Sequence, residues 1–372
     1  MAPTAAQRTW EAENDIITVD PTSNALYKLP THSEYQALQN AHPWRTNPNY
    51  FTHVRISALA LLKMTTHAAS GGDLEIMGLM TGYVSGTSLI ITDAFRLPVE
   101  GTETRVNAQA DADEYMVMFG ELARNGGGQQ ENPIGWYHSH PGYGCWLSGI
   151  DVSTEMLQQS VNDPFVAVVI DPKRTVSAGK VEIGAFRTYP EGHRPANKGF
   201  NDDDEFQPVP VDKQDDYGAH SNSYYPLEVT HFKSSLDSHL LDLLWNKYWT
   251  STLSQSPLYT NRDFSNKRIH DHSLKLRAAA NKYRSSGPSM TARPRELVSS
   301  ADANRNIKVQ NDGEMEKLVR TGERIAGEEV AGLWADEVKK KLFMGVVQEA
   351  RLNAAKQQAT AAAAGSAAQS QV

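Results

Sequence analysis

The segment from Gly135 to Asp151 constrains the fold and the chemistry of this chain more than any other part of the sequence. It reads Gly-Trp-Tyr-His-Ser-His-Pro-Gly-Tyr-Gly-Cys-Trp-Leu-Ser-Gly-Ile-Asp. Its first residues favour a short strand, which Pro141 and the glycines after it must end in a sharp turn. Ser148-x-x-Asp151 has the spacing of a helix capping box. The segment therefore predicts a strand, a tight loop and a helix in close succession.

The side chains of this segment have the chemistry of a metal site. Because side chains alternate along a strand, His138 and His140 point to the same side and can hold one cation. Asp151, at the start of the next helix, is a plausible third ligand. Two imidazoles and one carboxylate leave one position of a tetrahedral zinc ion open, which is the pattern of a catalytic rather than a structural site. A water molecule in that position becomes a nucleophile near neutral pH.

Such a site requires a base for the proton of the attacking water, and Glu75 is the candidate. Residues 74–84 read as a strand with two apolar faces, so Glu75 is expected to be buried in the centre of a sheet. Burial is expected to raise its pKa toward the range useful for proton transfer. Ser148 is expected to donate a hydrogen bond to the oxyanion formed when water attacks a carbonyl. A structural carboxylate at Glu75 and a capping role for Ser148 are the alternatives.

Composition narrows the kind of site and of partner. Cys145 is the only cysteine, which excludes intrachain disulfides and a zinc site built mainly on thiolates. It favours a reducing, intracellular compartment, and we expect Cys145 to be a small buried residue. A net charge of −8 argues against a general nucleic-acid binder. No apolar run reaches the roughly 18 residues that a membrane helix needs.

A second His-x-His pair provides an internal comparison. His270-Asp271-His272 lies in a basic stretch that is expected to be helical, and no glycine turn follows it. Tyr283 stands at the spacing where Asp151 follows His140, and tyrosine is not a zinc ligand. The second pair is therefore expected to be structural or solvated.

The rest of the chain predicts an α/β or α+β catalytic domain between a polar arm and C-terminal helices. Five units are expected: 1–50, a mostly irregular arm with one short helix at 33–40; 51–255, the domain, with insertions near 98–130 and 190–222; 256–305, a linker or irregular helical segment; 306–353, a helical assembly segment; and 354–372, a disordered tail. Within the domain, helices are expected at 56–69, 108–124 and 151–161, and strands at 74–84, 88–97, 134–139, 165–170, 179–189 and 224–231.

Glu75, His138-x-His140-Pro141 and Ser148-x-x-Asp151 together resemble the signature of the JAMM metalloproteases, also called the MPN-plus domain. These are zinc isopeptidases that cut ubiquitin or ubiquitin-like modifiers from lysine side chains. The resemblance implies a curved β-sheet flanked by helices and one catalytic zinc ion. It implies zinc ligation by His138, His140 and Asp151, water activation by Glu75, and oxyanion support by Ser148. No nucleophilic serine or cysteine is implied.

Further segments are similar to the branch of this family found in the COP-nine signalosome. They are residues 56–64, 101–108, 142–147, 232–237 and 244–249, and the similarity spans roughly 40–255. The resemblance implies a deneddylase of the cytoplasm and nucleus, which removes a ubiquitin-like modifier from the cullins of RING ubiquitin ligases. Its implied partners are the other signalosome subunits, including a second MPN-domain subunit, with no role for nucleic acid or a membrane.

Two alternatives to this function differ in chemistry. One is a JAMM deubiquitinase of another assembly, such as the proteasome lid. The other is a non-catalytic MPN scaffold, which usually lacks the ligands present here. A zinc deaminase is excluded because the Pro-Cys-x-x-Cys half of its signature is absent.

Two segments outside the signature predict control and assembly. Glu103, Thr104 and Arg105 lie in a polar loop at 98–107, and we expect Glu103 or Thr104 to occupy or shield the open metal position in the isolated chain. An ordinary surface loop is the alternative. Residues 314–352 carry an apolar stripe at helical spacing, which is expected to dock into a helical bundle with other subunits.

Overall fold

The computed structural model describes residues 5–19, 32–97, 132–190, 209–234, 261–285 and 315–334, with a few isolated positions between and after them. Three expectations lie outside these residues: the control loop with Glu103, Thr104 and Arg105, the helix at 108–124, and the tail at 354–372. Of the helices that are described, none is both long and apolar enough to cross a membrane.

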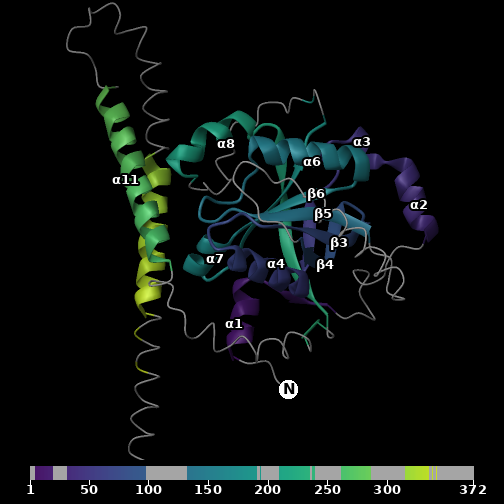
Figure 1. Ribbon diagram of the computed structural model, residues 1–372, viewed down its shortest axis with the longest axis horizontal. Helices are drawn as coiled ribbons and strands as arrows, with labels where there is room; N and C mark the ends of the chain where they lie inside the picture. Colours follow the sequence, from purple (N-terminus) through teal and green to yellow (C-terminus); the bar gives the residue numbers. More distant parts are fainter. Residues whose placement is uncertain are drawn as a thin grey trace, which may run out of the picture.

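One mixed sheet forms the centre of the fold (Figure 1). Its strands are β1 (Ile17–Thr18), β2 (His53–Ser57), β3 (Met77–Ser85), β4 (Ser88–Arg96), β5 (Asn132–Ser139), β6 (Val166–Asp171), β7 (Glu182–Thr188) and β8 (Tyr224–Lys233). They lie in the order β1-β8-β2-β4-β3-β5-β6-β7, and β7 also pairs with β8. The first part of β8 pairs with β7 and the second part with β2. The sheet therefore closes on itself, which confirms the expected curved sheet.

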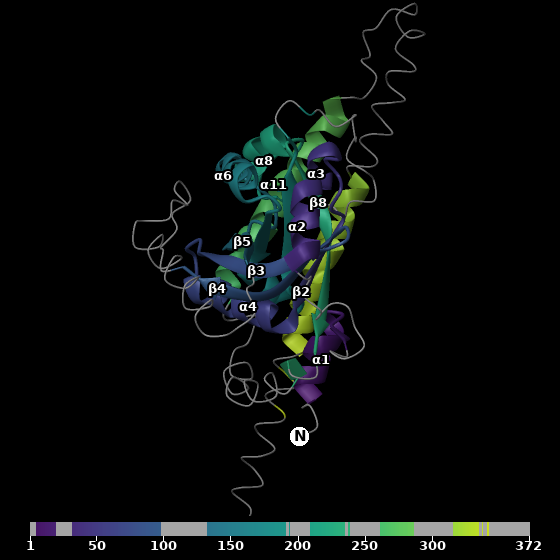
Figure 2. The ribbon, with the colours of Figure 1, turned by 90° about the vertical axis from the view of Figure 1, so that its right-hand side faces the viewer.

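Helices cover the two faces of the sheet and extend beyond it (Figure 2). They are α1 (Ala5–Glu13), α2 (His32–Ala41), α3 (Pro43–Thr46), α4 (Ala58–Gly71), α6 (Gly149–Asn162), α7 (Pro172–Ala178), the short 3-10 helix η2 (Val211–Lys213), α8 (Gln214–His220) and α11 (Arg262–Ser285). In Figure 1, α4 and α6 lie on opposite sides of the strands. The mixed α/β class with flanking and C-terminal helices is confirmed.

β6 shows how the sheet separates two hydrophobic cores. All of its residues are buried, and they alternate between the two sides. Val168 packs in the cluster that contains Leu61 of α4, whereas Val169 packs in the cluster that contains Val152 of α6. The continuous apolar run expected at 165–170 is therefore a central strand that is covered on both faces.

The same alternation places the metal ligands. Trp136 of β5 belongs to the cluster on the α6 side, and His138 and His140 follow it at intervals of two residues. β5 and β6 are parallel neighbours, and α6 is the crossover between them. The two histidines therefore face the beginning of α6, where Asp151 lies.

The N-terminal arm is more ordered than its polar sequence indicates. The expectation of a mostly irregular arm is wrong for its described residues, which form α1, β1, α2 and α3, and only α2 coincides with the expected helix at 33–40. Tertiary contacts hold the arm in place. Trp10 packs against the main core, Asn14 accepts a hydrogen bond from the backbone of Val181 at 3.0 Å, and β1 pairs with β8. Local composition does not reveal partners that are so distant in sequence.

The segment at 256–305 is expected to be a linker or an irregular helical segment, and within it residues 262–285 form the regular 24-residue helix α11. Charged pairs support this helix where apolar periodicity is weak. Asp271 and Lys275 pair within it at 2.8 Å. Arg268 reaches Glu328 at 2.5 Å, in the helix at 315–334 that lies beside α11 (Figures 1 and 2).

The stripe expected in residues 314–352 is only partly buried. Within 315–334, Leu318 and Ile325 are buried, whereas Val330, Leu333 and Trp334 are exposed, and 67% of Trp334 is accessible. The end of this described helix therefore carries apolar side chains that nothing in the chain's described part covers.

Candidate metal centre

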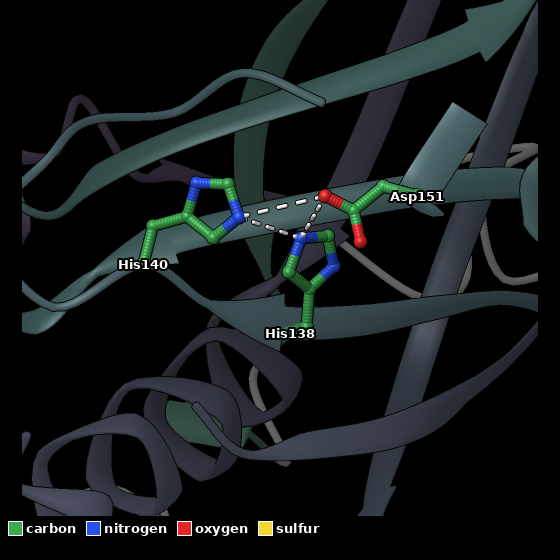
Figure 3. A group of neighbouring side chains, drawn as sticks. All are labelled: His138, His140 and Asp151. Carbon is green, nitrogen blue, oxygen red and sulfur yellow. Dashed lines mark hydrogen bonds and ion pairs between the residues drawn. The ribbon is translucent and has the colours of Figure 1, made fainter. Parts of the chain in front are cut away.

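His138, His140 and Asp151 converge on one point (Figure 3). The two histidine Nε2 atoms are 3.0 Å apart, and Asp151 Oδ2 lies 3.5 Å from His138 Nε2 and 3.7 Å from His140 Nε2. All three side chains are buried, with residue exposures of 1%, 2% and 3%. Among the residues that the structure describes, this is the one group of three or more potential ligands close enough to hold a metal ion.

Local structure explains why these side chains meet. β5 ends after Ser139, and a turn closed by glycines brings the chain to the N-terminus of α6. Ser148 is the N-cap of that helix and forms a capping box with Asp151. In that box the Ser148 backbone N–H and hydroxyl both donate to Asp151 Oδ2, at 2.9 and 2.7 Å. The oxygen that faces the histidines is thereby fixed by the helix cap itself, and the expected capping box is confirmed.

The two histidines are held in different ways. His140 Nδ1 donates to the carbonyl of Gly144 at 3.0 Å, so its Nε2 presents a lone pair to the centre. His138 stacks on Trp136 with ring centroids 4.5 Å apart, and its buried Nδ1 has no hydrogen-bond partner in the described part of the chain. Two imidazoles and a carboxylate with a fixed outer hydrogen bond match the donor set of catalytic zinc.

The electrostatics of the centre also favour a cation. Burial lowers the pKa of His138, but the carboxylates of Asp151, Glu75 and Glu155 together raise it, and the net shift is upward. Burial raises the pKa of Asp151, but His138 and His140 hold it well below its usual range. Two imidazole nitrogens and an ionised carboxylate thus face one another at the place where a metal ion would bind.

Glu75 lies beside the centre, but not as expected. It precedes β3 by two residues, is half-buried, and follows the exposed Leu74. The expectation of a carboxylate buried inside a central strand is therefore wrong. Ser139 fixes the position of Glu75 through the neighbouring residue Ile76. Ser139 N donates a hydrogen bond to the carbonyl of Ile76, and Ser139 Oγ accepts one from Ile76 N, each at 3.0 Å. The serine between the two histidines thereby draws the loop of the candidate base toward the ligands.

A pocket of about 370 Å³ contains Glu75, His140, Ser148 and Asp151. Tyr143 also lines it, stacks on His140 with centroids 4.5 Å apart, and donates a hydrogen bond to Glu75. One oxygen of Glu75 is thus held by the phenol, which orients the carboxylate.

Part of the lining of this pocket comes from the segment at 190–222, which reads in sequence only as a polar surface insertion. Lys213, Asp216 and His220, at the end of η2 and in α8, line the pocket. The Lys213 ammonium lies 5.4 Å from the ring centre of Tyr143. Sequence reasoning missed these residues, and polarity alone carries no signal that could have identified them.

Cys145 is buried as expected, and the second His-x-His pair lies in α11. Cys145 is buried, and burial raises the pKa of its thiol well above the ordinary value, so it is not an activated nucleophile. In α11, Asp271 accepts a hydrogen bond from Val211 N at 2.8 Å, and no metal-ligand cluster forms around His270 and His272, both of which are described.

Glu155 is a buried carboxylate that sequence reasoning also missed. It is fully buried in α6 and accepts hydrogen bonds from Trp136 Nε1 at 2.9 Å and from Gln159 Nε2 at 2.8 Å. Burial raises its pKa from 4.5 to about 7, although Arg187 acts in the opposite direction.

A Glu155→Gln substitution is expected to stabilise the protein increasingly as pH rises from 4.5 to about 7, and by its full amount above that. Because the folded-state pKa is raised, ionisation of Glu155 destabilises the folded state as pH rises from 4.5 to about 7. The full difference is about 3 kcal/mol, and the amide still accepts from Trp136. The free energy of unfolding, measured in urea at pH 5 and pH 8, should differ between parent and variant mainly at pH 8. An equal difference at both pH values would contradict the assignment.

Comparison with known proteins is consistent with this geometry. Residues 49–164 match the family described as JAB1/Mov34/MPN/PAD-1 ubiquitin protease, and residues 254–344 match the Cop9 signalosome subunit 5 C-terminal domain. The COP9 signalosome complex subunit 5 of Aspergillus fumigatus is 54% identical over 342 residues, which cover 92% of this chain and 97% of the relative. The chain belongs to the COP9 signalosome subunit 5 family.

Other members of the subunit 5 family come from distant organisms. Subunit 5a of Arabidopsis thaliana is 51% identical over 341 residues, covering 91% of this chain and 92% of the relative. Subunit 5 of Drosophila melanogaster is 49% identical over 339 residues, covering 91% of this chain and 97% of the relative. The similarity thus extends well beyond the expected 40–255. The enzyme class is that of the JAMM metalloisopeptidases, which are hydrolases, and membership favours the signalosome over the proteasome lid or a non-catalytic scaffold.

Proposed function

We propose that this chain is the zinc-dependent catalytic subunit of a COP9 signalosome and that it removes a ubiquitin-like modifier from lysines of cullins. The observation that carries the proposal is the convergence of two imidazoles and a carboxylate next to Glu75, in one pocket. Membership of the subunit 5 family supports the choice of complex. Cullins of RING ligases and the modifier are the proposed substrate.

Zinc is the metal that this donor set fits, and His138, His140 and Asp151 would hold it. When bound, zinc lowers the pKa of water and polarises a carbonyl oxygen. The chain itself provides the remaining functions. Glu75 accepts the proton of the attacking water and returns it to the lysine amine as the amine leaves. Tyr143 holds one Glu75 oxygen, and the Glu75 residue lines the pocket.

Ser148 is the proposed donor to the oxyanion. Its hydroxyl donates to Asp151 Oδ2 at 2.7 Å, so this role requires the hydroxyl to turn toward the substrate while the backbone N–H keeps its bond to the same oxygen. The helix cap can tolerate the rotation of the hydroxyl, because the Ser148 backbone N–H still donates to Asp151 Oδ2.

The proposed partners are other signalosome subunits, including a second MPN-domain subunit. Val330, Leu333 and Trp334, which are exposed on the helix at 315–334, support docking of this helix against other subunits. Control of the metal site by the loop that contains Glu103, Thr104 and Arg105 stays a proposal. Localisation of the protein in the cytoplasm and nucleus is also a proposal.

The proposal predicts substrate preference as well as cleavage. The assembled complex with zinc is expected to remove the modifier from a neddylated cullin at least about tenfold faster, in kcat/KM, than it cleaves a ubiquitin chain, since a tenfold preference requires only about 1.4 kcal/mol of differential transition-state binding. Gel-based cleavage of both substrates with the same preparation measures this. Faster cleavage of ubiquitin chains would favour the deubiquitinase alternative, and inactivity on both would favour the scaffold.

A further inference from the structure

Asp171, at the end of β6, lies outside the JAMM signature and is a carboxylate with 0% exposure. It accepts backbone hydrogen bonds from four residues. Two of them, Lys173 and Arg174, begin α7, for which Asp171 is the N-cap. The other two, Gly142 and Gly144, belong to the loop after His140, and both donate at 2.9 Å. Capping a helix accounts for only half of these bonds.

The loop is shaped so that both glycine N–H groups reach this one carboxylate. Gly142 and Gly144 have φ values of +96° and +92°, which side chains other than glycine rarely adopt. A Cβ atom on Gly144 would also lie 2.8 Å from Arg174 Nη1. The Arg174 guanidinium packs against the loop there, with its Nε 3.2 Å from Asp171 Oδ2. The buried carboxylate is thus compensated by four N–H donors and one cation.

Gly144 connects this carboxylate to the metal centre. Its N–H donates to Asp171 Oδ2, and its carbonyl accepts from His140 Nδ1 at 3.0 Å. The position of that carbonyl decides which nitrogen of His140 carries the proton, and therefore whether Nε2 offers a lone pair to a metal. A carboxylate on β6 thus acts on His140 through a single residue.

We propose that Asp171 is a positioning residue for the zinc ligand His140, acting through the backbone of Gly144. This inference rests on the proposed function, since it assumes that the three converging side chains bind zinc. It assigns to Asp171 a second role besides capping α7: Asp171 sets the tautomer and orientation of His140 before the metal arrives.

Asp171→Asn separates the two roles. The amide oxygen of the asparagine can replace Oδ1, which accepts hydrogen bonds from the backbone of Gly142, Lys173 and Arg174. The NH2 group then replaces Oδ2. Because NH2 is a donor, it cannot accept the hydrogen bond from the Gly144 N–H. Zn²⁺ affinity of the full chain, measured by competition with a chromophoric chelator, is expected to fall about 10- to 100-fold, as for other outer-shell partners of metal ligands. Ser57→Ala is the matched control. It removes the N-cap of α4, away from the loop, and should leave Zn²⁺ affinity unchanged.

A second measurement needs no variant and does not depend on zinc. In the metal-free parent chain, ¹⁵N NMR of the imidazoles is expected to show His140 protonated at Nδ1, and hydrogen exchange should show a protected Gly144 amide. Unchanged Zn²⁺ affinity in Asp171→Asn, an equal loss in Ser57→Ala, or a proton on His140 Nε2 alone in the parent would each overturn the inference. Failure of the parent to bind Zn²⁺ would instead overturn the proposed function, so the two outcomes are distinct.

Discussion

Glu75→Gln is expected to slow isopeptide hydrolysis by about 10²–10⁴-fold, the usual contribution of a general base, without weakening the binding of zinc. The amide has the shape of the carboxylate and can still accept from the Tyr143 phenol, but it cannot take a proton from water. Glu75 is not among the three converging ligands, so the metal centre should stay intact. Single-turnover cleavage of a neddylated cullin by the assembled complex, with zinc content measured on the same sample, tests both statements.

Glu228→Gln provides the control for this experiment. It makes the same chemical change on β8, where the Glu228 side chain is 68% exposed and pairs with His53. Its cleavage rate should equal that of the parent. A Glu75→Gln enzyme with full activity would remove Glu75 from the mechanism, and a loss of zinc along with activity would make it a residue of the metal site instead.

His138→Ala is expected to abolish both zinc binding and hydrolysis. It removes one of the three donors and leaves the buried Asp151 carboxylate without the imidazole that lies 3.5 Å away. Zinc that binds only the folded state raises stability by about 2.7 kcal/mol at 100 times its Kd. The parent should therefore melt at a higher temperature as zinc is added, whereas the variant should show no zinc-dependent shift.

The second His-x-His pair supplies the control. His270→Ala removes an exposed histidine of the same spacing from α11, so its melting temperature should rise with zinc as in the parent. A zinc-dependent shift that persists in His138→Ala, or disappears in His270→Ala, would contradict the assignment of ligands.

The sequence predicted the strand-loop-helix unit of the site well because its signals are local. Alternation placed His138 and His140 on one face, and the capping spacing placed Asp151 at a helix start. Glu75 was identified for a partly wrong reason. Its position depends on the bonds between Ser139 and Ile76, which join residues that are far apart in the chain. Pattern reading cannot detect such bonds.

Residues whose role comes from tertiary contacts were missed. Asp171 reads as the polar end of a buried strand, and its bonds to Gly142 and Gly144 exist only once β6 lies beside β5. The sequence indicates a solvated insertion that contains Lys213, Asp216 and His220. Polarity indicates that a segment is accessible to water, but not that it lines the pocket beside the metal ligands. The regularity and length of α11 were not predicted for a related reason, since its support comes from charged pairs such as Arg268 and Glu328.

The start of α11 also touches the loop that follows His140. Phe264 is buried, and it sits so close to Gly142 that a Cβ on that glycine would lie 2.9 Å from its ring. Asn261, just before α11, donates to the carbonyl of Lys173 at 2.7 Å, so this junction is also tied to α7. A displacement of α11 by a partner subunit would therefore press on the loop that carries Gly144. If such a displacement changed metal affinity, metal binding would have to change assembly by the same free energy.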